Sequence, residues 1–198
     1  LYKYKSLYRH PVRALQCLTG SNLAMEVHFK GDCDFFRILT RTQDQFVRVV
    51  HCRRTQQGLR SNHGYSLLWV GEVGKTTSSK EEAATRQLVV LRNPHGRHSY
   101  RGNFGHGCRR WTTVEGKAIL KQLGAENCLQ SCDLDALDPT VGRRDNGIFC
   151  MEFESFVQCF PIMTLVEIEA SEESRSQDCI YQLKTMAHLE LVLDAIGA

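Results

Sequence analysis

The chain has 198 residues, 42% of them hydrophobic and 24% charged, so it is long enough for one domain, or one domain plus a fragment, and too apolar for wholesale disorder. Its net charge of +3 is too small to favour a nucleic acid or an anionic membrane as the partner. No apolar run approaches the ~18 residues that a membrane-spanning helix needs, and the first residues do not resemble a signal peptide. We therefore expect a soluble protein and, because the chain begins with Leu1 rather than Met, a piece of a longer one.

The cysteines indicate a reducing compartment. They are odd in number, and their spacing forms no disulfide framework. Cys128 and Cys132 are the only closely spaced pair, and no second pair completes a zinc site. We expect reduced thiols and a cytoplasmic location. The nine positions are Cys17, Cys33, Cys52, Cys108, Cys128, Cys132, Cys150, Cys159 and Cys179.

The first quarter of the chain predicts short elements. Apolar residues at near-helical spacing predict a helix over 11–20, ended by Gly20. Residues 27–29, 35–39 and 46–51 are interpreted as short extended or mixed segments, separated by turn residues.

Two clearer strands follow, over 65–73 and 88–91. The polar stretch 74–85 between them is interpreted as an exposed hairpin loop, and Asn93-Pro94 ends the second strand.

The remaining elements complete an α+β pattern. Helical spacing predicts helices over 114–123 and 153–160, and alternation predicts a strand over 162–168. Asn146-Gly147 is typical of a hairpin turn between two strands. No long helix separates the strands, so we expect an antiparallel β-sheet or barrel with a few short helices.

The polar stretch 169–178 is interpreted as a linker. We expect one domain over residues 1–169, and a linker with the start of a following segment over 170–198. Apolar residues on one face predict a helix in the last twenty residues.

One histidine and one asparagine could form a catalytic pair. His63 precedes the strand 65–73 and Asn93 follows the strand 88–91, so a hairpin would bring the two side chains together. An amide oxygen that holds one imidazole nitrogen leaves the other as a general base, as in a Cys-His-Asn triad. Taken alone, His63 could equally be a satisfied histidine at the edge of the core, and Asn93 a plain turn residue.

Four segments resemble, in order and spacing, the second half of the calpain protease core. The family has Gly-His-Ala-Tyr-Ser around its histidine, Arg-Asn-Pro-Trp-Gly around its asparagine, and Asp-Gly-Glu-Phe-Trp-Met-Ser-Phe before its closing helix and strand. The matching segments here are Ser61-Asn62-His63-Gly64-Tyr65-Ser66, Arg92-Asn93-Pro94-His95-Gly96, Tyr100-Arg101-Gly102-Asn103-Phe104 and Asp145-Asn146-Gly147-Ile148-Phe149-Cys150-Met151-Glu152-Phe153. Ala14-Leu15-Gln16-Cys17-Leu18-Thr19-Gly20 is similar to the family's Ala-Leu-(Ser/Thr)-Gly-Gly, so the resemblance covers about Tyr2 to Glu169.

The resemblance implies the His/Asn-bearing half of a papain-like core in an intracellular cysteine endopeptidase. His63 and Asn93 would be catalytic, polypeptides would be the substrates, and the Cys-bearing half of the same core would be a partner. The family's nucleophile lies in a Gly-Asp-Cys-Trp segment upstream of Ala14. Gly31-Asp32-Cys33-Asp34 comes after it, and the neighbouring carboxylate would disfavour a thiolate, so we do not assign Cys33 as the nucleophile.

The chain departs from the family pattern at several places, and two of them bear on function. His95 replaces a tryptophan that shields the catalytic pair from water, which weakens that contact. The family's calcium ligands correspond to Ser99, His106, Asn146 and Ile148, which bring no carboxylate. We therefore expect no metal or cofactor in this half and place any Ca²⁺ in the missing first half. The alternative function is a catalytically inactive calpain-like module that binds protein partners.

Two further clusters are interpreted as ordinary surface. His95, His98, His106 and Cys108 fit no tetrahedral zinc motif. Asp133, Asp135 and Asp138 lack the glycine and the terminal glutamate of a calcium loop, so we expect a solvated acidic loop.

Overall fold

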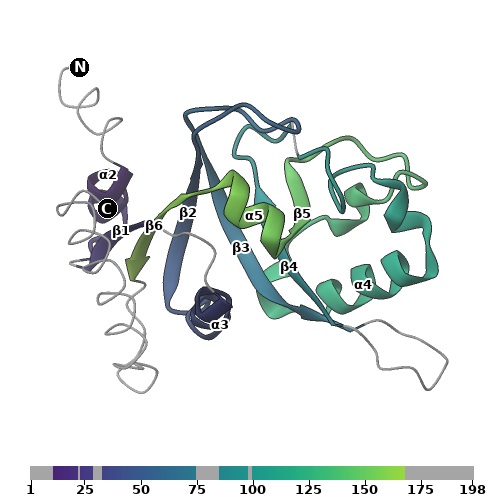
Figure 1. Cartoon of the computed structure of the whole chain (residues 1–198), viewed down its shortest axis with the longest axis horizontal. Helices are drawn as coiled ribbons and strands as arrows, with labels where there is room; N and C mark the ends of the chain where they lie inside the picture. The colour runs from purple at the N-terminus through teal and green to yellow at the C-terminus, as the bar shows by residue number, and fades with distance from the viewer. Residues whose placement is uncertain (1–10, 22, 29–32, 75–84, 98–99, 168–198) are drawn as a thin grey trace.

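The chain folds around one antiparallel sheet of six strands, in the order β1-β6-β2-β3-β4-β5 (Figure 1). This computed structural model describes residues 11–21, 23–28, 33–74, 85–97 and 100–167. The strands are β1 (Ala24–His28), β2 (Phe46–Cys52), β3 (His63–Val73), β4 (Arg86–Arg92), β5 (Ile148–Glu152) and β6 (Ile162–Glu167). The α-helices are α2 (Pro11–Thr19), α3 (Cys33–Arg41), α4 (Val114–Gly124) and α5 (Phe153–Cys159), and three 3-10 turns are η1 (Arg109–Thr112), η2 (Asn127–Leu129) and η3 (Leu134–Leu137). The expected α+β fold is confirmed, and within the described residues the sheet does not close into a barrel.

Burial explains why the strands differ in sequence. β2 alternates between buried and half-buried residues, because only one of its faces is fully covered. β4 and β5 each contain four consecutive buried residues, because both of their faces are covered. A continuous apolar run such as 88–91 is the pattern expected of a strand in that position.

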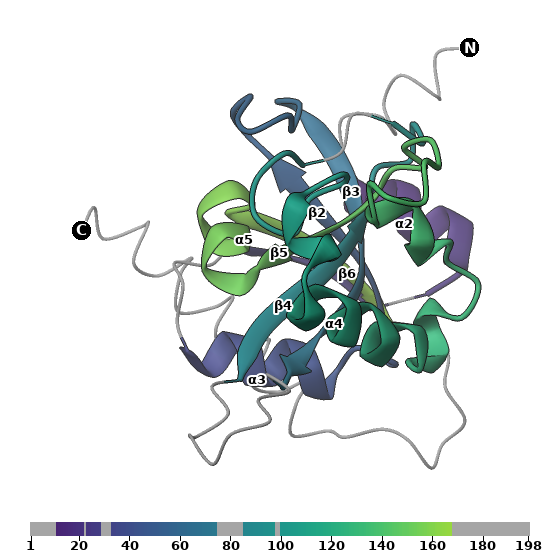
Figure 2. The same ribbon diagram turned by 90° about the vertical axis from the view of Figure 1, so that its right-hand side faces the viewer.

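Two apolar clusters lie on opposite faces of β4 and β5. The first packs α3 and α5 against the sheet, with Phe35, Leu39, Tyr65, Leu91, Phe149 and Phe156 among its members. The second packs α4 and the 3-10 turns against the other face, with Trp69, Leu88, Val90, Trp111, Ile119 and Cys150 among its members. Figure 2 shows α4 in front of β4, with α3 and α5 away from it on the other side of the sheet. The first cluster extends beneath the start of β3, where His63 lies.

The predicted hairpin is confirmed at its two strands. β3 and β4 pair antiparallel from Val73 opposite Arg86 to Ser66 opposite Arg92, with an irregularity between Leu67 and Trp69. The start of β3 therefore lies beside the end of β4. Most of the expected loop lies outside the described residues.

The interpretation of residues 35–39 as extended or mixed was wrong, because they belong to helix α3. Phe35, Phe36, Ile38 and Leu39 are all buried, at the i, i+1, i+3, i+4 spacing of one helix face. A short apolar run of this kind is compatible with a strand as well as a helix, and packing against the sheet decides between them.

The prediction of a hairpin at Asn146-Gly147 was also wrong. β5 follows this dipeptide, but the residues before it form turns and the 3-10 helix η3, and β5 pairs with β4 instead. The Asp145 and Asn146 side chains accept hydrogen bonds from the backbone N–H of Gly147 and Ile148, at 2.8 and 2.9 Å. These local bonds make a turn without a second strand.

The other predicted elements are confirmed with small shifts in their bounds: α2, β2, α4, α5 and β6. β1 begins three residues before the segment predicted at 27–29. The expected domain end, linker and terminal helix lie outside the described residues. None of the described helices is long and apolar enough to cross a membrane.

Candidate active site

His63 and Asn93 meet where β3 begins and β4 has just ended. The Nε2 atom of His63 lies 2.8 Å from the Oδ1 atom of Asn93. His63 is the first residue of β3 and is half-buried, whereas the Asn93 side chain is completely buried. The contact expected from the sequence is therefore present.

Hydrogen bonds fix Asn93 through both polar groups of its side chain and through its backbone. Its Nδ2 donates to the carbonyl of Arg97 at 2.7 Å, and its Oδ1 also accepts from the N–H of His95 at 3.1 Å. Its backbone N–H donates to the carbonyl of Gly147 at 2.8 Å, and its own carbonyl accepts from the N–H of Gly96 at 2.9 Å. This network fixes which end of the amide faces His63.

The orientation of the amide sets the proton on the imidazole. An amide oxygen can only accept, so Nε2 of His63 must donate and carry a hydrogen. In the neutral ring Nδ1 is then the unprotonated nitrogen, which can take a proton from a nucleophile. The pair can therefore act as an oriented general base.

Two aromatic rings flank His63. Tyr65 meets it edge-on, with ring centroids 4.8 Å apart and planes at 78°. Its hydroxyl oxygen accepts from the N–H of Arg60 at 2.9 Å, which fixes the ring. His95 stacks on His63, with ring centroids 4.7 Å apart and planes at 15°. His95 is exposed, so the ring that stacks on His63 is itself open to water.

The comparison with protein families agrees with this arrangement. A family model described as calpain family cysteine protease matches residues 8–167. The chain belongs to this family. A comparison with individual curated proteins gave no match. His63 and Asn93 both lie within the matched range, as do all the strands of the sheet.

In the described part of this calpain-family chain, no cysteine hydrogen-bonds to the His63 ring. Cys52 lies directly opposite His63 in the β2–β3 ladder, but it is buried and its thiol donates to the carbonyl of Arg54 at 2.9 Å. Burial raises the pKa of the Cys52 thiol, which disfavours the thiolate. Cys33 begins α3, and both views place α3 where β2 begins and β3 ends, away from the loop that leads into His63 (Figures 1 and 2). Its side chain lies outside the described set.

Gly147 supports the site in a way that the sequence analysis missed. Its carbonyl receives the N–H of Asn93, and its φ is +85°. A Cβ atom there would lie 2.5 Å from the carbonyl oxygen of Asn93 and 2.9 Å from the Cα of Gly96. Only glycine allows this approach. The Asp-Asn-Gly motif indicated a turn with positive φ. It did not indicate that Gly147 would approach Asn93.

Of the four positions that the sequence analysis matched to the family's calcium ligands, the structure describes three. Ile148 is buried in the second apolar cluster. The Asn146 side chain donates to the carbonyl of Asp133 at 2.8 Å and accepts from the N–H of Ile148. His106 brings nitrogen rather than a hard oxygen, and Ser99 lies outside the described residues. Within the described chain no three His, Cys, Asp or Glu side chains converge in a group that could hold a metal.

The expected solvated acidic loop needs correction at Asp138, which is buried. Its carboxylate is hydrogen-bonded by Lys117 and by the Thr140 hydroxyl. These hydrogen bonds, with that of Lys117 the largest cause, lower the pKa of Asp138 to about 2. Asp133 and Asp135 both lie beside Arg143. The acidic residues thus stabilise the segment that precedes β5.

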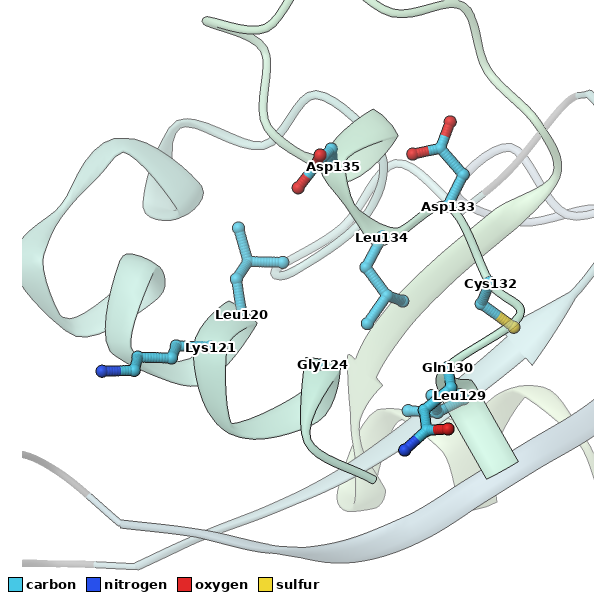
Figure 3. A pocket seen from close by; sticks show the side chains of 9 residues that line it. All are labelled: Leu120, Lys121, Gly124, Leu129, Gln130, Cys132, Asp133, Leu134 and Asp135. Atoms are coloured by element: carbon cyan, nitrogen blue, oxygen red, sulfur yellow. The ribbon is translucent and has the colours of Figure 1, made fainter. Parts of the chain in front are cut away.

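A pocket of about 270 Å³ lies between α4 and the η2 and η3 turns. In Figure 3 the Leu120 and Leu134 side chains point toward the space from opposite sides, while Lys121 turns away from it. Neither His63 nor Asn93 lines it. This pocket is separate from the His63–Asn93 pair.

Proposed function

We propose that this chain is the His/Asn-bearing half of a cysteine endopeptidase that hydrolyses peptide bonds in proteins. The observation that carries the proposal is the 2.8 Å contact between His63 and a fully bonded, buried Asn93. The nucleophilic cysteine is proposed to lie upstream, in the other half of the same core.

The proposed mechanism uses His63 twice. Nδ1 takes the thiol proton of the cysteine, and the thiolate attacks the scissile carbonyl carbon. The imidazolium then donates that proton to the leaving amine, which leaves an acyl-enzyme for water to hydrolyse. Asn93 keeps the ring oriented through both transfers and accepts a stronger hydrogen bond when the ring is charged.

Further parts of the proposal concern partners, location and calcium. Polypeptides are the substrates, and the Cys-bearing half packs beside this one. The free state of the described cysteines supports a cytoplasmic location. We place any calcium requirement in the upstream half. A micromolar binding isotherm in a calcium titration of this chain would contradict that assignment.

A second candidate function is an inactive calpain-like module that binds protein partners. It is favoured by the exposed His95, which stands where the family has a shielding tryptophan. An upstream Gly-Asp-Cys-Trp supports the enzyme, whereas Ser or Gly in place of that cysteine supports the module.

The deciding experiment measures peptidase turnover by the full-length protein on an unfolded polypeptide. Thiol alkylation should abolish turnover, and His63→Ala should lower it by ~10² to 10⁴, the contribution of general acid-base catalysis. His28→Ala, at an exposed histidine on β1, is the matched control and should not change it. Equal turnover in His63→Ala and the unmodified protein would remove the enzyme from consideration.

A further inference from the structure

An arginine-rich surface surrounds the end of the sheet that carries His63 and Asn93. We call it the basic rim. The backbone N–H of Arg101 donates to the carbonyl of Gln57 at 2.8 Å, which joins the loop after β2 to the loop after β4. Figure 1 shows these two loops together above the start of β3. The rim consists of six exposed residues: Arg53, Arg54, Arg60, Arg92, Arg97 and Arg101.

Within the described residues, no acidic side chain forms an ion pair with the rim. Residues 45–71 and 83–114 contain no Asp or Glu at all. In the described part of the chain, the ion pairs of arginine and lysine involve Arg86, Lys117 and Arg143, and none involves the rim. Asp145 lies in the segment that Asn93 contacts through Gly147, and its carboxylate accepts from the N–H of Gly147. One such carboxylate cannot offset six guanidinium groups.

The loop after β2 presents its arginines on a rigid turn. Gln57 and Gly58 both have positive φ, +46° and +86°, and Gln56 and Leu59 exchange two backbone hydrogen bonds across them. Leu59 is fully buried, and the Arg60 N–H is bonded to the Tyr65 hydroxyl that lies beside His63. A rigid backbone lowers the entropy that a ligand must overcome on binding.

We propose that the basic rim binds an acidic segment of the polypeptide substrate next to the scissile bond. The cleavage part of this inference rests on the proposed function, whereas the binding part does not. A guanidinium group pairs with a carboxylate through two parallel hydrogen bonds, so a segment rich in Glu or Asp matches the rim. A single-stranded nucleic acid fits less well, because its binding depends mainly on many phosphate contacts and the net charge of the chain is only +3.

The binding test uses a fluorescein-labelled peptide of alternating Glu and Gly, with a Lys-Gly peptide of equal length for comparison. Fluorescence anisotropy with this chain should give tighter binding of the Glu peptide, and binding should weaken between 50 and 300 mM NaCl because salt screens exposed charges. The triple variant Arg53→Gln, Arg54→Gln, Arg101→Gln should weaken it about tenfold. Arg13→Gln, Arg41→Gln, Lys121→Gln removes the same charge elsewhere and should have little effect.

Charge reversal gives a second variant with a gain of binding. Replacing Arg53, Arg54 and Arg101 with Glu should reverse the preference toward the Lys peptide. Equal weakening by both Gln triples would overturn the proposal, because net charge rather than the rim would then set binding. Tighter binding of a single-stranded RNA of equal charge than of the Glu peptide would also overturn it.

Cleavage by the full-length protein separates the two proposals. With an acidic substrate, the triple Gln variant should raise KM about tenfold and leave kcat unchanged. Binding without any cleavage would remove the proposed function and leave the basic rim as a peptide-binding surface. Cleavage with the same KM for acidic and neutral substrates would overturn the basic rim and leave the peptidase.

Discussion

The molecule uses charged side chains differently in two loop regions. Near His63 and Asn93, six exposed arginines form no ion pair within the described chain, and Asn93 meets His63 through the oxygen of a neutral amide. In the segment 133–145, opposite charges are paired, with Asp138 against Lys117 and two further aspartates against Arg143. Paired charges hold a segment in place, whereas unpaired ones remain available to a ligand.

The difference between these two regions shows how a polar side chain such as Asn93 can be buried and still hold a reactive side chain such as His63. Burying a charge is costly unless it is paired, but a neutral amide needs only its hydrogen bonds satisfied. Asn93 meets that condition with neighbouring backbone groups and the His63 ring. His63 is therefore oriented without a buried carboxylate. Three predictions test this contrast between the contact of His63 with the Asn93 amide and the paired charges of the 133–145 segment.

The largest effect is expected from Asn93→Ala in the full-length protein. The change removes the acceptor for His63 and leaves the Arg97 carbonyl without its donor, so turnover should fall about 10- to 100-fold. The free energy of unfolding should fall by about 1–3 kcal/mol. Peptidase assays and urea unfolding measure the two effects.

Asn93→Asp serves as the matched variant, because it keeps an acceptor for His63 but sets a carboxylate oxygen, in place of the donor, against the Arg97 carbonyl. It should retain more turnover than Asn93→Ala. If the two variants lost turnover equally, the contact with His63 would not be the reason for the loss.

Gly147→Ala is expected to have the next largest effect. The new Cβ would lie 2.5 Å from the Asn93 carbonyl oxygen, and φ is +85°. Thermal unfolding should show a loss of about 1–3 kcal/mol. Gly142→Ala is the control, since its φ is +69° but no atom lies within 4 Å of the new Cβ. A loss equal to that of the control would mean that backbone strain alone, without the approach to Asn93, accounts for the effect.

The smallest effect is expected from Lys117→Met in the paired region. The pKa of Asp138 is lowered to about 2 from an ordinary 3.8, so the stability it contributes is complete above pH 3.8 and is lost as the pH falls toward 2. Because Lys117 is half-exposed, the variant should lose at most about 1 kcal/mol at pH 7.

Urea unfolding of Lys117→Met and the unmodified chain at pH 5 and pH 2.5 measures this dependence on pH. The variant should lose less stability between the two values than the unmodified chain does. Lys121→Met on the same helix, whose lysine has no ion pair in the described structure, is the control. Parallel pH dependences in all three proteins would contradict the assignment of the shift to Lys117.

Local sequence patterns were sufficient for much of the fold. The strands at 65–73 and 88–91 were predictable because β-branched and aromatic runs ended at clear turn residues. Local patterns failed at 35–39, where a set of four apolar residues fits either a strand or one face of a helix. They also failed at Asn146-Gly147, where side-chain hydrogen bonds make the turn without a second strand.

The sequence by itself determined the two residues of the candidate site, because His63 and Asn93 flank strands that can be predicted locally and lie in motifs of the calpain family. The tertiary structure decided which imidazole nitrogen is bonded, that Gly147 supports Asn93, and that two arginine-bearing loops meet at the end of the sheet that carries the pair. These features join residues that are far apart in the chain. Their contacts depend on how the strands pair and on which loops meet at one end of the sheet, and no local pattern carries that information.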